Sequence, residues 1–579
     1  MELQSLIYLF VGISFTIYFG LALWTKASST KDFYIAQNSF SPVTNGISVA
    51  VDFISAVTFI ALAGTVSLLG FNGSAYIMGF TGGFVLLALL VVPYLRKFGQ
   101  FTITDFIEAR YYSKFARNIA IFIVIIVSFI YISAQMKGIG IVFSRIFQID
   151  KDMALFIAIG VAFLYSLIGG MRSTSYAQIA QYVIILFAFL TPVIYLSLDL
   201  TNTFFPQLAI FSKTTFAFHS GIKNIPEGTF LLHALDNALS DFGFSYTSPS
   251  NYVNLFSISL ALMLGVASLP HVLSKFILTP SVEDTRKSTF WALLFIAIIY
   301  TSLSSLGALS KINVIKNTQD IEYETFINDE IKNSNGTINN GKWLKTWEEI
   351  KYVQFKDKNS NEKIDTNPSE TNELFIDTDI QTLINPEIAN LPNWAIALTL
   401  AGALAAALST ITGLILILSS TISKNYDFRF KNSFVFKMLP KLMLFITIFF
   451  ATFFTIPNFS IVQTVAIAFN ILAATLFPII ILGIFDKKTN KQGAIWGLTI
   501  GLFFTLSYMI YFLFIENSVN GVNNYLFGIS TEGIGIIGAL LNFIIAIIVS
   551  RFTSKVPDDV ILLIDNLRSP SAKKEHKIR

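Results

Sequence analysis

The chain has 579 residues, of which 54% are hydrophobic and only 13% are charged, and its mean hydropathy is +0.64. Soluble domains carry about 25% charged residues, so this composition excludes an ordinary soluble protein and indicates one that crosses a membrane several times. No cysteine is present, which excludes disulfides, thiol catalysis and thiolate metal sites. The formal net charge of +4 says little about partners, because the position of charges matters more than their sum in such a chain.

Many apolar runs are about 20 residues long, which is enough to cross a hydrocarbon core of about 30 Å. The first run, Leu6–Trp24, is too long for a cleavable signal peptide and lacks a basic leader and a clear cleavage site. We therefore expect it to be the first span. We predict about thirteen spans in all, at residues 5–25, 44–70, 75–95, 117–146, 153–170, 175–198, 252–280, 287–311, 392–423, 435–455, 459–484, 491–515 and 532–551.

The connections between these spans alternate in charge. Short connections near 71–74, 456–459 and 516–531 carry almost no basic residues. The intervening connections and the tail all carry Lys or Arg: Thr25–Phe33, Arg96–Arg117, Arg172, Glu283–Lys287, Ser423–Lys431, Asp486–Lys491 and the residues after Arg551. Because short basic loops face the cytoplasm, we expect the N-terminus outside and the C-terminus inside, which requires an odd number of spans.

Two long polar segments, at about 200–250 and 312–391, fall on the outer side. The second has eight Lys and fifteen acidic residues, a net charge of −7, and long loops are translocated regardless of charge. Within it, Asp357–Asp365 has oxygen-bearing side chains at alternate positions, as calcium loops do, but it lacks the Gly at position six and has Pro368 at position twelve. We therefore favour a solvated, partly disordered insertion over a calcium site.

Three apolar segments contain polar residues at mid-span, and such residues usually mark a transport pathway. The first segment, 44–70, contains Asp52, Ser55 and Thr58. A helix that breaks there would free backbone carbonyls to bind a cation. The alternative is that Asp52 lies near the cytoplasmic mouth or pairs with a buried Lys.

The second segment, Gly265–Phe276, has a proline inside an apolar span, and proline removes a helical hydrogen bond and kinks or breaks the helix. The proline belongs to a cluster that spans about two turns: Ser268, Pro270, His271, Ser274 and Lys275. His271 could donate to an anionic substrate or exchange protons. The alternative is a kinked helix in which a backbone carbonyl satisfies His271.

The third segment, Ala401–Thr421, has an Ala-rich face that allows close helix packing, followed by the adjacent hydroxyls of Ser409 and Thr410. In a membrane such hydroxyls often only hold helices together, but paired hydroxyls also suit a hard cation, which prefers oxygen ligands. Two further polar side chains, Gln135 and Asn470, stand alone in their spans. Each either lines a path or bonds between helices.

No P-loop of the form GxxxxGK[ST], zinc-ligand spacing, catalytic triad or kinase module is present. We therefore do not expect an enzyme, nor transport driven directly by ATP on this chain. The energy would come from an ion gradient or from a partner.

Several stretches resemble signature segments of the sodium/solute symporter family, most closely its branch of cation/acetate symporters (acetate permeases). They are DFISAVTFIALAG (52–64), FGQFTITDFIEARY (98–111), SLPHVLSKF (268–276) followed by EDTRKSTFWA (283–292), and STISKNYDF (420–428). The resemblance covers nearly the whole chain apart from the two outer segments. It implies an all-α polytopic membrane protein with the LeuT-like fold, two inverted five-helix repeats and about 13 transmembrane helices.

The resemblance also implies how the chain is divided. The expected parts are a first helix and cytoplasmic loop (1–43), the first repeat (44–198), an extracytoplasmic loop (199–251), the second repeat (252–484) interrupted by the acidic insertion (312–391), additional C-terminal helices (485–552) and a cytoplasmic tail (553–579).

In this family a sodium ion lies between the first and the eighth repeat helix, bound by two carbonyls of the former and by one carbonyl and two hydroxyls of the latter. The implied sodium ligands are Val51, Ile54, Ala406, Ser409 and Thr410, with Ala50 and Phe53 as the alternative carbonyl register. We predict substrate contacts for Phe53, Ser55, Thr58, Gln135, Ser268 and His271, and a coupling role for Asp52. A sodium ion that orders the broken helix beside the substrate would raise the affinity for the substrate, and bound substrate would raise the affinity for sodium by the same factor.

Together these residues and the resemblance imply a secondary active transporter of the cell (inner) membrane that couples inward sodium flow to uptake of a small monocarboxylate such as acetate by alternating access. Na+ would be the co-transported ion, and the partners would be the lipid bilayer and a small organic anion, with neither nucleic acid nor an obligatory protein partner. The alternatives are a sodium symporter for proline or another small organic solute, a sensor built on a transporter-like domain, and a passive channel. The short tail after Arg551 disfavours the sensor.

Overall fold

The computed structural model describes residues 2–25, 40–99, 102–168, 171–328, 330–332, 338–425, 445–453, 459–515 and 524–569. Some features predicted from the sequence lie partly outside these residues: the first cytoplasmic loop, the end of STISKNYDF and of the connection Ser423–Lys431, both ends of the span at 435–455, the connections at 456–459 and 516–531, and the end of the tail.

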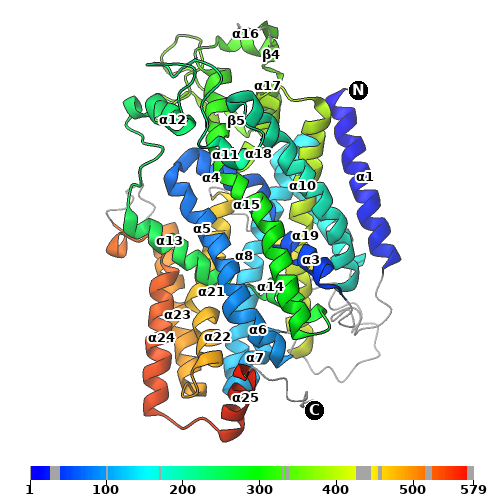
Figure 1. Cartoon of the computed structure of the whole chain (residues 1–579), viewed down its shortest axis with the longest axis vertical. Coiled ribbons are helices and arrows are strands. Elements are labelled where there is room, and N and C mark those ends of the chain that lie inside the picture. Colours follow the sequence, from blue (N-terminus) through cyan, green and yellow to red (C-terminus); the bar gives the residue numbers. More distant parts are fainter. Residues whose placement is uncertain are drawn as a thin grey trace.

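Long apolar helices form most of the structure (Figure 1). Within the described residues ten helices are long and apolar enough to cross a membrane, or eleven when a bent pair is counted as one span. The prediction of an all-helical polytopic chain is confirmed, whereas the total of thirteen spans stays a prediction. The helices that meet this criterion are built on α1 (Leu3–Trp24), α5 (Phe71–Leu86) with α6 (Val92–Phe98), α8 (Lys114–Phe147), α10 (Met171–Thr201), α13 (Tyr252–Val266), α15 (Val282–Thr318), α19 (Asn393–Asn425), α21 (Ile461–Ala474) with α22 (Leu476–Phe485), α23 (Lys491–Ile510) and α24 (Gly535–Phe552). A further long helix, α9 (Lys151–Ile168), lies outside that count.

The bent pair consists of α3 (Pro42–Phe53) and a second half made of a π-helical turn (Val57–Ala61) and α4 (Leu62–Leu69). The two halves differ in direction by 61°. Ser41 caps α3 by accepting the N–H of Thr44, and Pro42 occupies the first turn, where no N–H is needed.

α19 lies at the centre of the helix bundle. Its most apolar window is completely buried, and it packs against α10, α8, α1 and α3. The small residues predicted to allow close packing do so: a Cβ on Gly402 would come within 2.2 Å of the Ala188 side chain on α10. Because α19 is enclosed by protein, its hydroxyl groups face other helices and not lipid.

The described residues of the two long polar segments, at about 200–250 and 312–391, are folded, in contrast to the solvated insertion favoured from the sequence. Figure 1 shows α12, α16 and α17 gathered at one end of the bundle, beyond the long helices. In α17, Trp343 and Trp347 are buried, and the Trp343 ring packs edge-on against Phe326 of α16. The short elements here are α11 (Pro206–Ala209), β1 (Phe218–His219), β2 (Asn224–Ile225), α12 (Leu231–Leu239), α16 (Tyr323–Asn328), β3 (Glu330–Lys332), β4 (Ile338–Asn340), α17 (Lys342–Glu349), β5 (Val353–Phe355), β6 (Leu374–Ile376) and α18 (Gln381–Ile388).

The strands of these outer segments form three antiparallel pairs, β1 with β2, β3 with β4, and β5 with β6. In the loop that resembles a calcium site, the Asp357 carboxylate accepts the N–H groups of Ser360 and Glu362. Its side chains therefore stabilise the loop itself, and the described residues contain no group of three or more acidic, His or Cys side chains that could hold a metal.

The opposite end of the bundle is covered by α7 (Ile103–Tyr111) and α25 (Asp558–Arg568) (Figure 1). α25 buries Val560, Ile564 and Leu567, and it packs against α7, α22 and α6. Arg110 of α7 is buried and donates to backbone carbonyls next to the end of α22. This end is therefore closed by short helices and side-chain bonds to backbone.

Candidate functional site

The first broken span supplies free backbone carbonyls in the middle of the bundle. α3 ends at Phe53, and the π turn starts at Val57. In a continuous helix the Val51 carbonyl would accept the N–H of Ser55, but Ser55 donates to Phe53 O instead. The break therefore leaves the Val51 carbonyl available to another group.

A glutamine of α8 frees the next carbonyl along the chain. The side-chain oxygen of Gln135 accepts the N–H of Ala56 at 3.1 Å. In a regular helix this N–H would donate to Asp52 O. Gln135 thus holds the break open from a neighbouring helix.

The paired hydroxyls of α19 face these carbonyls. Ser409 Oγ lies 3.2 Å from Val51 O, and Thr410 Oγ1 lies 3.2 Å from Asp52 O. Both hydroxyls also lie near the Ala406 carbonyl, at 2.8 and 3.4 Å. Three carbonyls and two hydroxyls, all uncharged and buried, thus meet between α3 and α19, and hard cations prefer such oxygens. We call these five groups the oxygen cluster.

The structure brings together four of the predicted sodium ligands: Val51, Ala406, Ser409 and Thr410. The Asp52 carbonyl joins them, whereas the fifth predicted ligand, Ile54, is buried at the break with neither hydroxyl bonded to it among the described residues. Both carbonyls of the alternative register are used by the backbone, since Ala50 O accepts from Ile54 and Phe53 O accepts from Ser55.

The second broken span is interrupted between Val266, where α13 ends, and Pro270, where α14 (Pro270–Lys275) begins. Proline has no N–H, so α14 starts without a bond to the preceding turn. Ser268 Oγ lies 3.2 and 3.1 Å from carbonyls of α13. The Ser268 hydroxyl, a predicted substrate contact, therefore bonds to carbonyls in the last turn of α13.

Two buried side chains near the breaks carry hydrogen-bonding atoms without a protein partner among the described residues. They are the amide nitrogen of Gln135 and both ring nitrogens of His271, and each side chain is at most 1% exposed. The His271 ring packs edge-on against Tyr131, with centroids 5.6 Å apart, and Tyr131 lies one turn before Gln135 on α8. Because buried polar groups are normally hydrogen-bonded, this arrangement indicates a place for a polar ligand.

Aromatic rings lie beside these groups. The Phe53 ring packs against Phe84 and Tyr300, at centroid distances of 5.3 and 5.5 Å. The Tyr300 hydroxyl is 2.7 Å from Thr58 Oγ1. Thr58, which the sequence predicted as a substrate contact, therefore already has a hydrogen-bond partner. Ser55 Oγ accepts the first N–H of the π turn at 3.2 Å. Aromatic rings thus lie beside the first break, and the hydroxyls of Ser55 and Thr58 already have protein partners.

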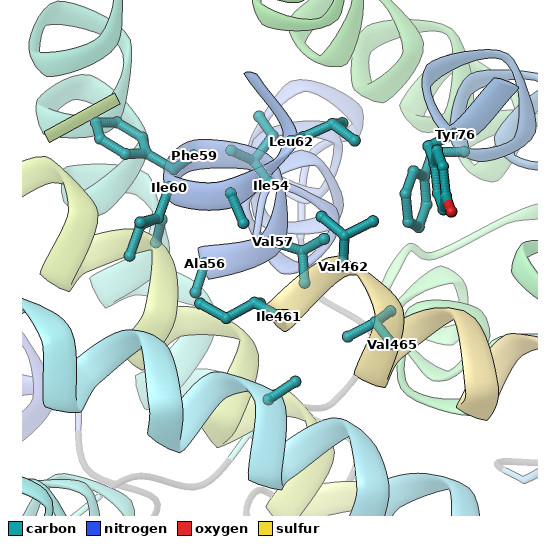
Figure 2. Packing of buried hydrophobic residues seen from close by; sticks show 14 of the residues in the cluster. Ile54, Ala56, Val57, Phe59, Ile60, Leu62, Tyr76, Ile461, Val462 and Val465 are labelled. Carbon is teal, nitrogen blue, oxygen red and sulfur yellow. The ribbon is translucent and has the colours of Figure 1, made fainter. Parts of the chain in front are cut away.

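Apolar packing seals the break on the side of α4. Figure 2 shows Ala56 and Val57 of the broken span next to Ile461 and Val462 of α21. These four residues are at most 2% exposed. A Cβ on Gly138 of α8 would come within 2.7 Å of the Ala56 side chain, so only glycine allows this approach. The site is thus enclosed in this conformation.

The Asp52 carboxylate pairs with a lysine of the second broken span. Lys275 Nζ lies 3.4 Å from Asp52 Oδ2, and both side chains are at most 1% exposed. The alternative stated from the sequence, that Asp52 pairs with a buried Lys, is confirmed. Asn470, by contrast, bonds to Glu532 O at 2.7 Å and to Gly535 N–H at 2.6 Å, and so joins α21 to the start of α24.

Sequence reasoning missed Gln178, Tyr131 and Tyr300. Gln178 bonds to the Asp52 carboxylate, and it could have been noticed as a polar residue within a predicted span. The two tyrosines had no such signal, because aromatic residues are common in spans and at their ends.

The helical fold, in which two interrupted helices contact each other, defines a class of protein, namely a LeuT-type secondary transporter. The fold matches that of a Na+-coupled sialic acid symporter in its substrate-bound outward-open state, with a TM-score of 0.66 and 14% sequence identity, over 96% of this chain and 99% of that one. The particular family follows from the sequence: the chain belongs to the sodium:solute symporter family, whose profile matches residues 33–333 and 378–501. It is a transporter and not an enzyme, and Na+ is its co-transported ion.

Two curated relatives extend this assignment. An uncharacterized symporter of Cupriavidus necator is 28% identical over 656 aligned residues, which cover 97% of this chain and 93% of the relative. A monocarboxylic acid transporter of Corynebacterium glutamicum is 29% identical over 309 residues, which cover 52% of this chain and 54% of the relative. The residues that the family profile skips, between 333 and 378, are the middle of the acidic insertion.

Proposed function

We propose that this protein uses the inward flow of sodium to take up a small monocarboxylate such as acetate. The observation that carries the proposal is the position of two buried hydrogen-bonding side chains, Gln135 and His271, beside the break whose carbonyls join the oxygen cluster. Sodium bound to the cluster would fix the broken end of α3, and Gln135 bonds to the same break. Binding of the ion would then favour binding of the substrate, and binding of the substrate would favour binding of the ion.

The chemistry of the site suits a short carboxylate. The Gln135 amide and one N–H of neutral His271 are donors for the two carboxylate oxygens. The rings of Phe53, Phe84 and Tyr300 lie next to the break and would cover a short alkyl group. A relative at 29% identity over half of this chain is a monocarboxylic acid transporter, which supports the same substrate class.

For alternating access we propose two closures: the packing of Ala56 against Ile461, and the buried Asp52–Lys275 pair, which joins α3 to α14. We propose that relative movement of the helix groups opens one closure at a time. We further propose that the protein resides in the cell membrane, with its N-terminus outside and its C-terminus in the cytoplasm.

The test is uptake of labelled acetate into proteoliposomes that contain the purified protein, with and without an inward sodium gradient. We expect accumulation above equilibrium only with sodium, and competition by propionate and pyruvate but not by proline or glucose. Accumulation of proline instead of acetate would favour the alternative of a symporter for proline or another small organic solute. Equal equilibration with and without sodium would contradict coupling and indicate a passive channel.

A further inference from the structure

Lys275 occupies a shell of oxygen atoms that resembles a cation site. Its ammonium lies 2.8 Å from Gln178 Oε1, 3.1 Å from both Ser48 Oγ and Ser175 Oγ, and 3.4 Å from Asp52 Oδ2. These oxygens come from α3 and α10, whereas the lysine comes from α14. One carboxylate, two hydroxyls and one amide oxygen are ligands that a hard cation such as sodium also accepts.

The shell contains one positive group, the Lys275 ammonium, and one negative group, the Asp52 carboxylate. Both are inaccessible to solvent. The Lys275 and Asp52 side chains are 1% and 0% exposed. A Cβ on Gly413 of α19 would lie 3.0 Å from the Asp52 carboxylate, which shows how closely protein surrounds it. Removal of the ammonium would leave a buried, unpaired carboxylate, which is strongly unfavourable. Neutralisation would then require a proton or a cation from solution.

The shell is directly connected to the oxygen cluster. Asp52 belongs to both, because its carbonyl accepts from Thr410 while its carboxylate faces Lys275. Gln178 forms a second connection, since its amide nitrogen donates to the Asp52 carboxylate and lies 3.4 Å from Ser409 O. Two cation positions, one for sodium and one filled by lysine, are thus adjacent and share a residue.

We propose that the Lys275 ammonium is a tethered cation that fills a second cation position beside the transported sodium, and so limits the cycle to one sodium ion per substrate. The inference rests on the proposed function, in that it takes the oxygen cluster as the sodium site. A mobile second cation would have to leave this shell in each cycle, whereas the lysine stays attached to α14 and can only move with it.

The test is the sodium dependence of uptake in the wild type, Lys275→Met and the double variant Asp52→Asn/Lys275→Met. Methionine keeps much of the length of the lysine side chain but has no charge. We expect a Hill coefficient for sodium of about one in the wild type and about two in Lys275→Met, because sodium then enters the shell. The double variant removes the carboxylate as well and should return to about one. Dual-label counting of sodium and substrate should give the same stoichiometries.

Several outcomes would overturn the inference. A wild-type stoichiometry of two sodium ions would show that the lysine does not exclude a second ion. A Lys275→Met variant that binds one sodium, as measured by equilibrium binding in detergent if transport is lost, would show that a proton and not sodium neutralises Asp52. A wild type without any sodium dependence would instead contradict the proposed function, so the two failures are distinguishable.

Discussion

The hydroxyls of α19 differ in what they contact, and this difference separates binding from packing. Ser409 and Thr410 reach carbonyls of α3. Among the described residues, Thr412, less than a turn further along, bonds to carbonyls of α19 itself, at 3.2 and 2.7 Å, and to no other helix. Three hydroxyls on one buried helix therefore have two distinct roles in the proposed mechanism.

We predict that Ser409→Ala/Thr410→Ala raises the sodium concentration for half-maximal uptake at least about tenfold, which corresponds to about 1.4 kcal/mol. The physical reason is the loss of two of the five oxygens in the cluster. Thr412→Ala is the matched control and should leave the sodium concentration unchanged. Uptake titrated with sodium at fixed substrate measures both, and an unshifted double variant would place the ion elsewhere.

At the same scale, we predict that His271→Ala raises KM for the carboxylate about tenfold with a smaller change in kcat, because one hydrogen bond to a charged group contributes roughly 1.5–3 kcal/mol. His271→Asn keeps an N–H donor near the same position and should recover part of the affinity. Initial uptake rates over a range of acetate concentrations provide the measurement. Equal KM values for the wild type and His271→Ala would remove the histidine from the substrate site.

At the scale of elements, a short segment of the acidic insertion lies against the second half of the broken span. This segment, which we call the lid, comprises a 3-10 turn at Thr378–Ile380 followed by α18. Thr378 O lies so near Gly64 of α4 that a Cβ there would be 1.9 Å away. The lid is bonded to α8 by two ion pairs, Lys137–Asp379 at 2.7 Å and Arg145–Glu387 at 2.9 Å.

Asp379 also holds the start of α21. Its two carboxylate oxygens accept the N–H of Ile461 at 3.0 and 2.9 Å, and a negative charge is favourable at the N-terminus of a helix. One side chain therefore ties the lid to both α8 and α21. Burial raises the pKa of Asp379 to about 6, and the nearby Lys137 ammonium opposes that rise.

We predict that Glu387→Gln destabilises the protein by about 3–5 kcal/mol, because it leaves the buried Arg145 charge without its partner. Both side chains of the pair are at most 4% exposed. The double variant Arg145→Met/Glu387→Met removes both charges and should be considerably more stable than the single variant. Unfolding in detergent, followed by tryptophan fluorescence, measures the difference. A single variant as stable as the wild type would mean that the pair does not fasten the lid.

A second contact between elements involves a carboxyl group whose pKa is raised. The Tyr76 hydroxyl of α5 donates to the carboxylate of Glu532, which precedes α24, and burial raises the pKa of Glu532 from 4.5 to about 7. The folded protein therefore holds this proton more tightly than the unfolded chain. The stabilisation is complete below about pH 4.5 and is lost as the pH rises through about 7.

We predict that the melting temperature of the wild type falls between pH 5 and pH 8 relative to Glu532→Gln, which cannot ionise. Thermal unfolding in detergent at a series of pH values gives the comparison. Parallel curves for the two proteins would show that Glu532 has an ordinary pKa.

At the scale of the whole molecule, the absence of cysteine makes every introduced thiol unique. We predict that Lys356→Cys in the insertion reacts with a membrane-impermeant maleimide in intact cells. Asn566→Cys in α25 should react only after the cells are permeabilised. Both positions are exposed, so access to the reagent depends on the side of the membrane. The reverse pattern would invert the proposed orientation.

The sequence was sufficient for the features that depend on local composition. The polar residues of the span at 44–70, Pro270 and the Ser409–Thr410 pair indicated where helices break and hydroxyls meet. The participation of the Asp52 carbonyl could not be predicted, because it depends on Gln135 accepting the N–H of Ala56, a residue 79 positions before it in the chain. The ion pairs of the lid join residues 242 positions apart. A charge count alone suggested a solvated loop there.

The contact between Ser409 and Val51 joins residues 358 positions apart in the chain. At a synthesis rate of about 5–20 residues per second, Val51 is made roughly 20–70 s before Ser409. During that interval the broken span has none of its partners from α19, and at first Asp52 also lacks Lys275. The centre of the transporter is thus assembled late in biogenesis. A nascent chain that stops short of α19 would expose unpaired carbonyls and a lone carboxylate to the membrane, which would mark it for quality control.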